Sequence, residues 1–524
     1  MKRLSSIILF SAALILMLAS CSKKQGSCLI PDNAFVVFRL DMTKLLESTG
    51  MKGDDATTKK EIEKFIKDAG LPKEAREKLL EIIDDPTSSG IDFTEPFFAY
   101  GALTKSSGGF EGGFVGCVAS KGNLEETIEK LGGNEGNFSL EEYGNGDVKY
   151  MMVDRNAAFI FNGDWFYVGP VEMSDNWEPD VDATIEQLLD RADGKDNIED
   201  NEAFKQMCDR KGLMQIGFFG TGFDGLPGTS EMLSQLPEDC ELKDIAGVTD
   251  LIINNGEIVM EGEAFLMSDA WKKQAELINY KTIEKSQAKY ADAEGALAIV
   301  NVDPKGLFNQ IRKIAKNAGL SDDDLDKLDE LKPVFDAFTG TGMAAINRLN
   351  SNGPEVVAYV GTRNSDLLDK LVNEKAANDE IIADGPNKYR LPIDYDFDYN
   401  DSIGDWVMMP TKFMQVGWKD KQTYFLINTD EEPFTTPRKP FTDVKGMGIY
   451  VYASGELMGE AIRSGEDEYS DGNSEKVAQA VEDIFDYAEL YLESPTKGVF
   501  RLATNKKDKS PIVFIIDYVK KTFL

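Results

Sequence analysis

The sequence predicts an α+β protein made of two tandem copies of one unit, each with a mainly antiparallel sheet packed by amphipathic helices. Apolar runs of strand length alternate with segments of helical apolar spacing, and similar blocks recur in the same order in both halves. A hydrophobic content of 42% is sufficient for packed cores. The predicted order is a signal peptide over 1–20, a lipidated tether over 21–27, a first unit over 28–270, a linker helix over 271–289 and a second unit over 290–524.

The N-terminal segment is typical of an exported bacterial lipoprotein. Lys2 and Arg3 precede an apolar run over 7–18, which is too short to span a membrane. The run ends in Leu18-Ala-Ser-Cys21, the lipobox pattern, in which small residues fit the signal peptidase and the thiol carries diacylglycerol. The alternative is an ordinary secretory signal with a chance cysteine. We therefore expect Cys21 to be lipidated, and the chain to be attached to the membrane through this lipid anchor only.

The residue after the anchor bears on location. Ser22, rather than an aspartate, resembles lipoproteins that are sorted to the outer membrane. No acidic run of the kind that resembles a surface-export signal follows Cys21. We expect an outer-membrane lipoprotein whose body faces the periplasm rather than the cell surface.

Composition excludes several functions. The net charge is −35, and −37 once Lys2 and Arg3 leave with the signal peptide, so the surface repels nucleic acid and anionic headgroups. The chain contains no histidine, which removes Ser-His-Asp and Cys-His catalysis and His-ligated zinc. Neither a cofactor nor a nucleic-acid partner is predicted, and any ligand or protein partner stays open.

Four cysteines remain besides Cys21, and all lie in the first half. No CxxC spacing occurs, so neither a zinc knuckle nor a thioredoxin-like motif is predicted. Cys117 lies in an apolar strand pattern and is interpreted as a core residue. Three pairings remain open for the four thiols, a Cys208–Cys240 disulfide among them, and the sequence does not choose between these and free thiols. The four are Cys28, Cys117, Cys208 and Cys240.

The clearest internal match joins residues 34–46 to residues 296–308. Each block reads as an apolar strand, then an aspartate, then a helix. Asp303 before Pro304 is a good N-cap followed by proline at the first helical position, and Asp41 occupies the same place. This match places Val37 and Ile299 at equivalent core sites.

Four further blocks follow in the same order, and a match of Val118 with Val360 is expected from the first of them. A weaker echo of the opening strand at 448–457 suggests a subrepeat within each copy. The paired segments are 114–121 with 356–363, the hairpin 159–168 turning at Asn162-Gly163 with 415–427, 203–219 with 433–452, and the strand pairs 250–254 and 257–265 with 498–503 and 512–517.

Helical inserts follow the first strand of each copy. Residues 60–66 and 77–83 in the first copy show 3.6-residue apolar spacing. Residues 322–331 and 334–338 take this place in the second copy. We interpret these stripes as faces turned to the core, in preference to membrane or partner helices.

Two enzyme-like motifs fail on their context. Gly220, Gly222 and Gly225 spell G-x-G-x-x-G after a strand, but Pro227 and a glycine-rich continuation prevent the helix that a dinucleotide site needs. Ser174 and Ser286 begin imitations of two elements of penicillin-interacting enzymes, in the wrong order and with no Lys-Thr-Gly after them.

Residues 394–402 alternate acidic and aromatic side chains, which predicts a strand with one solvated acidic face. As a calcium loop the segment begins well, but Asp401 stands where glycine is needed and Val407 where glutamate is needed. Asp396, Asp398 and Asn400 are weak candidate metal ligands. Asp401-Ser-Ile403 is similar to the sequon for protein O-glycosylation in Bacteroidetes-type bacteria, which makes Ser402 a candidate site.

Two functions stay open. The first is a non-catalytic binding or scaffolding module, favoured because no complete catalytic constellation is visible. The alternative is a carboxylate-dependent hydrolase acting on envelope or dietary glycans, because 92 acidic residues leave room for a catalytic pair. Five tryptophans could stack on sugars: Trp165, Trp177, Trp271, Trp406 and Trp418. Packing is the default for Trp165, Trp406 and Trp418, which lie in or near predicted strands.

The lipobox, the Ile30-Pro-Asp-Asn-Ala34 lead-in to the first strand and the aspartate-led helix after it resemble one known family. It comprises lipoproteins of roughly 500 residues from gut Bacteroidetes and is catalogued as a domain of unknown function. The resemblance implies a similar architecture over the whole mature chain. Its motifs are structural, so it implies no active site. The second copy lacks the Pro-Asp lead-in before Ala296.

Overall fold

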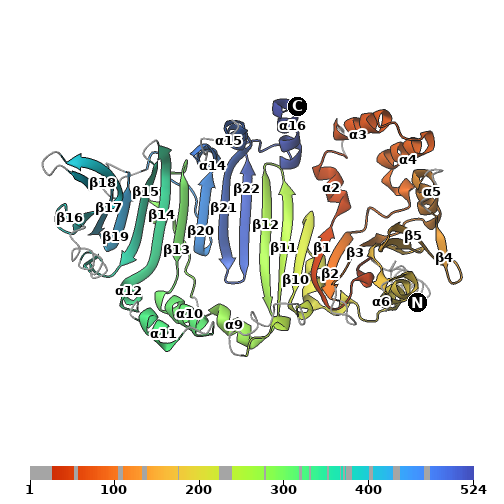
Figure 1. Cartoon of the computed structure of the whole chain (residues 1–524), viewed down its shortest axis with the longest axis horizontal. Coiled ribbons are helices and arrows are strands. Elements are labelled where there is room, and N and C mark those ends of the chain that lie inside the picture. Colours follow the sequence, from red (N-terminus) through yellow and green to blue (C-terminus); the bar gives the residue numbers. More distant parts are fainter. Residues whose placement is uncertain are drawn as a thin grey trace, which may run out of the picture. The chain divides into compact units, whose positions relative to one another are not determined.

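The computed structural model of the chain divides into two compact units. Unit 1 comprises 1–229 and 242–252, and unit 2 comprises 230–241 and 253–524 (Figure 1). The structure describes residues 26–51, 57–103, 110–132, 139–174, 176, 178–223, 236, 239–276, 279–317, 321–329, 332–350, 353–365, 368–369, 372, 381–400, 405–428, 437–464 and 473–523.

Unit 1 is built on an antiparallel sheet in the order β4-β5-β6-β7-β3-β2-β1-β10-β11. A separate short hairpin pairs β8 (Glu172–Met173) with β9 (Pro179–Asp180). The strands are β1 (Ala34–Leu40), β2 (Phe97–Leu103), β3 (Phe110–Cys117), β4 (Glu141–Tyr143), β5 (Val148–Asp154), β6 (Ala157–Phe161), β7 (Trp165–Pro170), β10 (Met214–Phe219) and β11 (Ile245–Asn254).

The helices of unit 1 largely follow the apolar spacing of the sequence. Part of the core forms where α5 packs Leu124 against Phe97, Val118, Phe161 and Phe166 from the sheet. The apolar stripe predicted on α3 is confirmed at Ile66, which is 7% exposed, but not at Phe65, which is 72% exposed. The helices are α2 (Met42–Ser48), α3 (Thr57–Asp68), α4 (Lys73–Asp84), α5 (Lys121–Gly132), α6 (Val181–Ala192) and α7 (Glu202–Cys208), with short 3-10 turns η1 (Gly26–Leu29), η2 (Pro86–Ser89), η4 (Ile198–Asp200), η5 (Gly220–Gly222) and η6 (Leu242–Asp244).

Unit 2 is also built on an antiparallel sheet, in the order β16-β17-β18-β19-β15-β14-β13-β20-β21-β22-β12. The strands are β12 (Glu257–Leu266), β13 (Ala296–Asn301), β14 (Phe338–Asn350), β15 (Gly353–Thr362), β16 (Ile382–Ala383), β17 (Lys388–Asn400), β18 (Asp405–Lys419), β19 (Gln422–Ile427), β20 (Met447–Ser454), β21 (Phe485–Ser494) and β22 (Lys497–Thr504).

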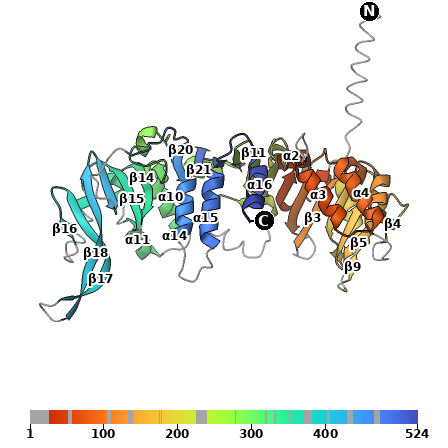
Figure 2. The same ribbon diagram turned by 90° about the horizontal axis from the view of Figure 1, so that it is seen from above.

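The helices of unit 2 gather at the two ends of its central strands. Within that unit, α14 and α15 lie at one end and α10 and α11 at the other (Figure 1), and all four lie on one side of the strands (Figure 2). They are α9 (Asp269–Glu276), α10 (Pro304–Asn317), α11 (Asp322–Asp329), α12 (Lys332–Ala337), α14 (Gly455–Ser464), α15 (Asn473–Ile484) and α16 (Pro511–Phe523), with the 3-10 turn η7 (Lys285–Ala288).

Local signals at the start of each unit are confirmed. The Asp41 side chain accepts a hydrogen bond from the Lys44 backbone N–H at 3.0 Å, and Asp303 accepts one from the Gly306 N–H at 2.9 Å. Both aspartates therefore cap the helix that follows the first strand. The predicted turn at Asn162 joins β6 to β7. The Asn162 side-chain oxygen accepts hydrogen bonds from the backbone N–H groups of Asp164 and Trp165.

Three expectations about segments were wrong. Residues 512–517 lie in helix α16 rather than in a strand, and β21 pairs with β22 instead. Of the linker predicted over 271–289, residues up to Glu276 lie in α9, whereas Lys285–Ala288 form the 3-10 turn η7 rather than an α-helix. Gly26 and Ser27, which the predicted tether over 21–27 includes, belong to a buried 3-10 turn instead. In addition, β12 pairs with β22, although its sequence falls in the predicted first unit. Among the described residues, no helix is long and apolar enough to cross a membrane.

Candidate functional site

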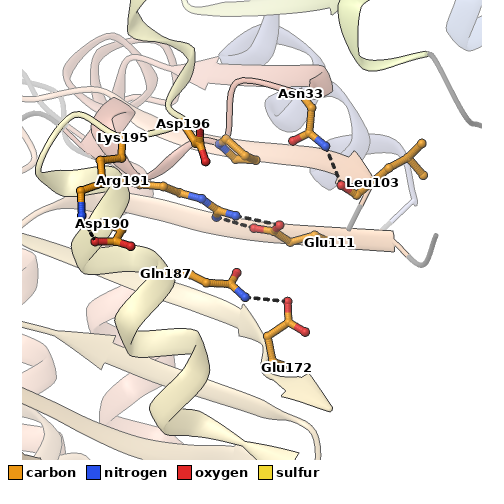
Figure 3. A pocket seen from close by; sticks show the side chains of 10 residues that line it. Asn33, Leu103, Glu111, Glu172, Gln187, Asp190, Arg191, Lys195 and Asp196 are labelled. Atoms are coloured by element: carbon orange, nitrogen blue, oxygen red, sulfur yellow. Dashed lines mark hydrogen bonds and ion pairs between the residues drawn. The ribbon is translucent and has the colours of Figure 1, made fainter. Parts of the chain in front are cut away.

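A polar cavity of about 250 Å³ lies in unit 1 (Figure 3). The lead-in to β1, the end of β2, β3, β8, helix α6 and the turn after α6 all contribute to its wall. The lining residues are Pro31, Asn33, Leu103, Glu111, Glu172, Gln187, Asp190, Arg191, Lys195 and Asp196.

A buried ion pair forms one wall of the cavity. Arg191 on α6 donates from Nη1 to Glu111 Oε1 at 2.5 Å and from Nη2 to Glu111 Oε2 at 2.9 Å. The side chains are only 11% and 15% exposed. Tyr100 donates its hydroxyl to the same Glu111 Oε1 at 2.9 Å. Both carboxylate oxygens are thus occupied by partners from the protein.

The environment fixes the charge state of this cluster. Burial lowers the pKa of Arg191, but the hydrogen bonds and charge of Glu111 outweigh burial, so the net pKa is raised. Burial, followed by the charge of Glu111, raises the pKa of Tyr100 well above its ordinary value. Arg191 is therefore a permanent cation and Tyr100 a neutral donor, and neither serves as a proton shuttle near neutral pH.

Polar side chains at the rim of the cavity also pair with one another. Lys195 contacts Asp190 at 2.6 Å, and Gln187 donates its Nε2 to Glu172 Oε1 at 3.1 Å. The lining carries four carboxylates and two cationic side chains. It therefore suits a small polar group, while the Arg191–Glu111 pair ties α6 to β3.

A glycoside hydrolase would need a carboxylic acid with a raised pKa beside a second carboxylate. Hydrogen bonds to neighbouring side chains lower the carboxyl pKa values of Asp85, Glu126 and Asp329, which is the opposite of what a catalytic acid needs. None of these three residues lines the cavity. The lining residues also include no tryptophan, so the cavity offers no indole platform for a sugar ring.

The second candidate site is an exposed apolar sheet surface in unit 2. Seven strands that are neighbours in the sheet each place one uncharged residue in a single row across it. In sheet order they are β12, β22, β21, β20, β13, β14 and β15. Met260 is 36%, Val451 38% and Leu490 43% exposed, and Val300 and Ile449 beside the row are 37% and 38% exposed. We call these nine residues the apolar face of unit 2: Met260, Phe500, Leu490, Val451, Ala298, Ala344 and Ala358 in the row, with Val300 and Ile449.

The opposite side of the same strands is packed. Leu297, Ile299 and Tyr450 alternate with the apolar face and are at most 2% exposed. Tyr359, on β15, donates its hydroxyl to the Gln287 carbonyl in η7. The strands therefore carry apolar side chains on both sides, and one of the two sides is open.

Unit 1 repeats this arrangement on a smaller scale. Phe38 pairs in register with Ile216 and Ala99, and Ala99 pairs with Phe114. Phe38 and Phe114 are each 38% exposed, and Phe218 on β10 is 49% exposed. Large apolar side chains therefore remain exposed on the sheet of each unit.

Several residues singled out from the sequence fall outside the described part of the chain. Cys21 and Ser402 are among them, and so are the side chains of Asp396, Asp398 and Asn400. The backbone of 394–400 lies in β17 and pairs with β18, so this segment is a strand, as interpreted. Among the residues that the structure describes, no three His, Cys, Asp or Glu side chains are grouped as a metal site would require.

Cys28, Cys117, Cys208 and Cys240 are thiols rather than disulfides in the structure. Cys117 is 1% exposed at the end of β3, as expected for a core residue, and its Sγ accepts the Gly26 N–H. Burial raises the pKa of Cys208 to about 11. A thiol with such a pKa stays protonated near neutral pH and is a poor nucleophile.

The glycine motif has a packing explanation. Gly220 and Gly222 form the 3-10 turn η5 rather than the start of an α-helix. A Cβ on Gly222 would lie 2.5 Å from the Asn33 carbonyl oxygen, and one on Gly220 would lie 1.6 Å from the Leu242 carbonyl oxygen. Both glycines therefore allow close backbone contact. Gly225 lies outside the described residues.

The described tryptophans are packed in the core or hydrogen-bonded to the protein through their indole N–H. Trp165 is 1% exposed in the core. Trp418 donates its Nε1 to Thr362 Oγ1, and Trp271 donates to the Glu241 carbonyl. Trp177 and the side chain of Trp406 lie outside the described residues.

Comparison with known proteins gives one match. A family model described as a domain of unknown function (DUF4836) matches residues 27–395. No curated protein and no solved structure matches the chain.

Proposed function

We propose that this chain, which belongs to the family described as a domain of unknown function (DUF4836), is a lipid-anchored envelope protein that binds an apolar partner without catalysing a reaction. The observation that carries the proposal is the apolar face of unit 2. Contiguous exposed apolar surface is unusual on a soluble monomer and marks interaction sites. This face is uncharged in a chain of net charge −35, so it is a local exception to a strongly acidic surface.

Energetics favour binding over a merely structural role for these side chains. Fully burying a leucine, valine or methionine is worth roughly 1.5–3 kcal/mol. Met260, Val451 and Leu490 retain more than a third of their exposure, so much of that free energy is still available to a partner. The strand backbones in the row are hydrogen-bonded on both sides from β22 to β15, so the face offers side-chain contacts rather than strand addition.

The dye Nile red, which is neutral and apolar, tests this function. We expect it to bind the mature chain, produced without signal peptide and lipid, with an increase in fluorescence. Leu490→Gln should weaken binding, whereas Val477→Gln, at a 46% exposed position on α15, should not. Equal dye binding by both variants, with the fold intact by circular dichroism, would contradict the proposal.

Anchoring is the second part of the proposal. Cys21 is proposed to carry the lipid, and the body to face the periplasm from the outer membrane. Support comes from the lipobox and the residue that follows it. Cys21→Ser should abolish labelling by radioactive palmitate, and label on the variant would overturn the assignment. Digestion of the body by protease added to intact cells would show that it faces outward instead.

The third part of the proposal is that the two units arose by duplication. In its support, the order β4-β5-β6-β7-β3-β2-β1-β10-β11 in unit 1 corresponds strand by strand to β16-β17-β18-β19-β15-β14-β13-β20-β21 in unit 2. The expected equivalents Val37 and Ile299 are both fully buried.

Hydrogen bonding shifts one expected equivalence. The Val118 N–H donates to the Asp164 carbonyl, and the Thr362 N–H donates to the Lys421 carbonyl. The two acceptors are equivalent, because Asp164 immediately precedes β7 and Lys421 immediately precedes β19. Val118 and Thr362 are both fully buried, whereas Val360 is half-buried. Val118 is therefore better matched with Thr362 than with Val360. The duplication would be contradicted if experimental structures of the two units could not be superposed in this strand order.

A further inference from the structure

We infer that the partner of the apolar face of unit 2 is a cationic amphipathic segment, which lays its apolar side on the face and directs its basic residues to carboxylates beside it. This inference rests on the proposed function and names the chemistry of the partner. It is carried by the contrast between the uncharged face and the charge of the helices at the ends of the same strands.

The first observation is the chemistry of the face itself. None of its nine residues is charged, and its exposed members are aliphatic. An anionic or strongly polar partner would find no counter-charge there. Its polar groups would lose their hydrogen bonds to water and would gain none from the face. The part of the partner that contacts the face must therefore be apolar.

The second observation is the charge at one end of the strands. Helix α14 follows β20 directly, contacts β14, β20 and β21, and packs against α15. Together α14 and α15 carry five carboxylates and two basic residues. Arg463 already pairs with Glu475 and Glu482, so the remaining acids outnumber the one remaining base. The exposed acids include Glu456 on α14.

The other end of the strands does not cancel this charge. Helix α10 carries four basic residues and no acid, but α11 carries five aspartates and one lysine. Arg312 on α10 pairs with Asp329 on α11 through Nε at 2.8 Å and Nη2 at 3.0 Å. The two helices balance each other, and the acidic excess remains at the α14–α15 end.

Charge also decides against two other occupants. A second copy of the chain would bring another net charge of −35 to the same surface. An anionic membrane would be repelled in the same way. A segment with basic and apolar sides meets both the face and its acidic border.

The test uses two labelled synthetic helices of about 18 residues, long enough to form a stable amphipathic face on binding. They share one leucine pattern and carry either lysine or glutamate at all polar positions. Fluorescence anisotropy with the mature chain should show at least about tenfold tighter binding of the lysine peptide. Affinity for it should fall as salt is raised, because exposed charges are screened.

Variants separate the two contributions. Leu490→Gln should weaken the lysine peptide about tenfold, as expected for a central apolar contact. Val153→Gln, at a 48% exposed position on β5 of unit 1, should leave its affinity unchanged. Glu456→Gln should flatten the salt dependence, because Glu456 is an exposed acid of α14 and is not one of the two glutamates that pair with Arg463. Glu178→Gln, an exposed carboxylate in unit 1, is the matched control.

The outcomes distinguish the inference from the function on which it rests. If Nile red binds at the face but both peptides bind equally or not at all, the cationic partner is wrong and the apolar function stands. If neither dye nor peptide responds to Leu490→Gln, the proposed function fails as well. Binding to vesicles with anionic lipids, lost in Leu490→Gln, would overturn the inference in favour of a membrane surface.

Discussion

Arg191 and Glu111 are 80 positions apart in the sequence and meet in a two-point ion pair, with Nη1–Oε1 and Nη2–Oε2 distances of 2.5 and 2.9 Å. The pair joins α6 to β3 beside the cavity of unit 1. We expect Glu111→Gln to destabilise the protein by about 3–5 kcal/mol, because it leaves a buried guanidinium without its counter-charge. Urea unfolding of the variant measures this loss.

A matched control exists on the same helix. Asp190 and Lys195 form an ion pair whose side chains are 62% and 65% exposed. Asp190→Asn should not change the urea midpoint measurably, because water screens such pairs. A Glu111→Gln variant that is as stable as Asp190→Asn would show that Arg191 is hydrated rather than held by the pair.

Gly222 should resist substitution because of the backbone beside it. A Cβ there would lie 2.5 Å from both the Asn33 oxygen and the Phe35 nitrogen. Gly222→Ala should lower the free energy of unfolding by about 1–3 kcal/mol, as overpacking does. Gly247→Ala is the control, since its Cβ would have no heavy atom within 4 Å. Equal thermal midpoints for the two variants would contradict the explanation of the glycine motif.

Tyrosine ionisation should couple to unfolding at high pH. Burial, followed by the nearby Asp486 carboxylate, raises the pKa of Tyr452 to about 12, and burial raises that of Tyr450 further. The folded chain keeps these protons while the unfolded chain loses them near pH 10, so their contribution to stability is complete below pH 10 and is lost as pH rises towards 12.

Tyrosinate absorbance during an alkaline titration checks this expectation. The exposed tyrosines should titrate first and reversibly, and a late fraction should appear together with the loss of circular dichroism. Tyr452→Phe should reduce the late fraction and extend stability to higher pH. A single titration near pH 10 with the fold intact would show that the buried hydroxyls reach water.

The two compact units should respond separately to core substitutions. Val37 and Ile299 are both 0% exposed. Ile299→Ala should destabilise unit 2 by about 2–5 kcal/mol, and Val37→Ala should destabilise unit 1 by about 2 kcal/mol. Hydrogen exchange read by mass spectrometry should show faster exchange in the mutated unit only. Equal acceleration in both units would mean that they unfold as one body.

Local signals in the sequence predicted much of the fold. Asp41 and Asp303 were identified as helix caps because a short acceptor before an apolar-periodic segment satisfies the first backbone donors. Asn162-Gly163 identified a hairpin for an equally local reason. The alternation of strands and helices was sufficient for an α+β class with an antiparallel sheet.

The failures arose where a local pattern supports two structures. The apolar run Ile512 to Ile516 fits a buried strand or a buried helix equally well. Pro511, which occupies the first position of α16, was the signal that would have favoured the helix. The sequence predicted a linker helix over 271–289 because the polar residues after Trp271 include no glycine or proline that would mark the end of a helix at Glu276.

The candidate sites depend on long-range contacts. Nothing near Glu111 in the sequence points to Arg191, because strand and helix meet only in the folded unit. Ile449 and Val451 alternate with Tyr450 and Tyr452, so β20 is apolar on both sides, which is the pattern of a strand covered on both. Which side stays open depends on which distant segments pack against each side, such as the η7 turn beside Tyr359, and no single strand carries that information.

The burial of η1 has a mechanical consequence for the proposed lipoprotein. Gly26 through Leu29 are fixed in unit 1, so only residues 22–25 separate Cys21 from packed structure. The five Cα–Cα steps from Cys21 to Gly26 span at most about 18 Å when fully extended. The anchored unit would be held close to the bilayer surface and would sample few orientations relative to it. Its acidic surface would turn away from anionic headgroups, so tether length and charge together would decide which side of the molecule meets the periplasm.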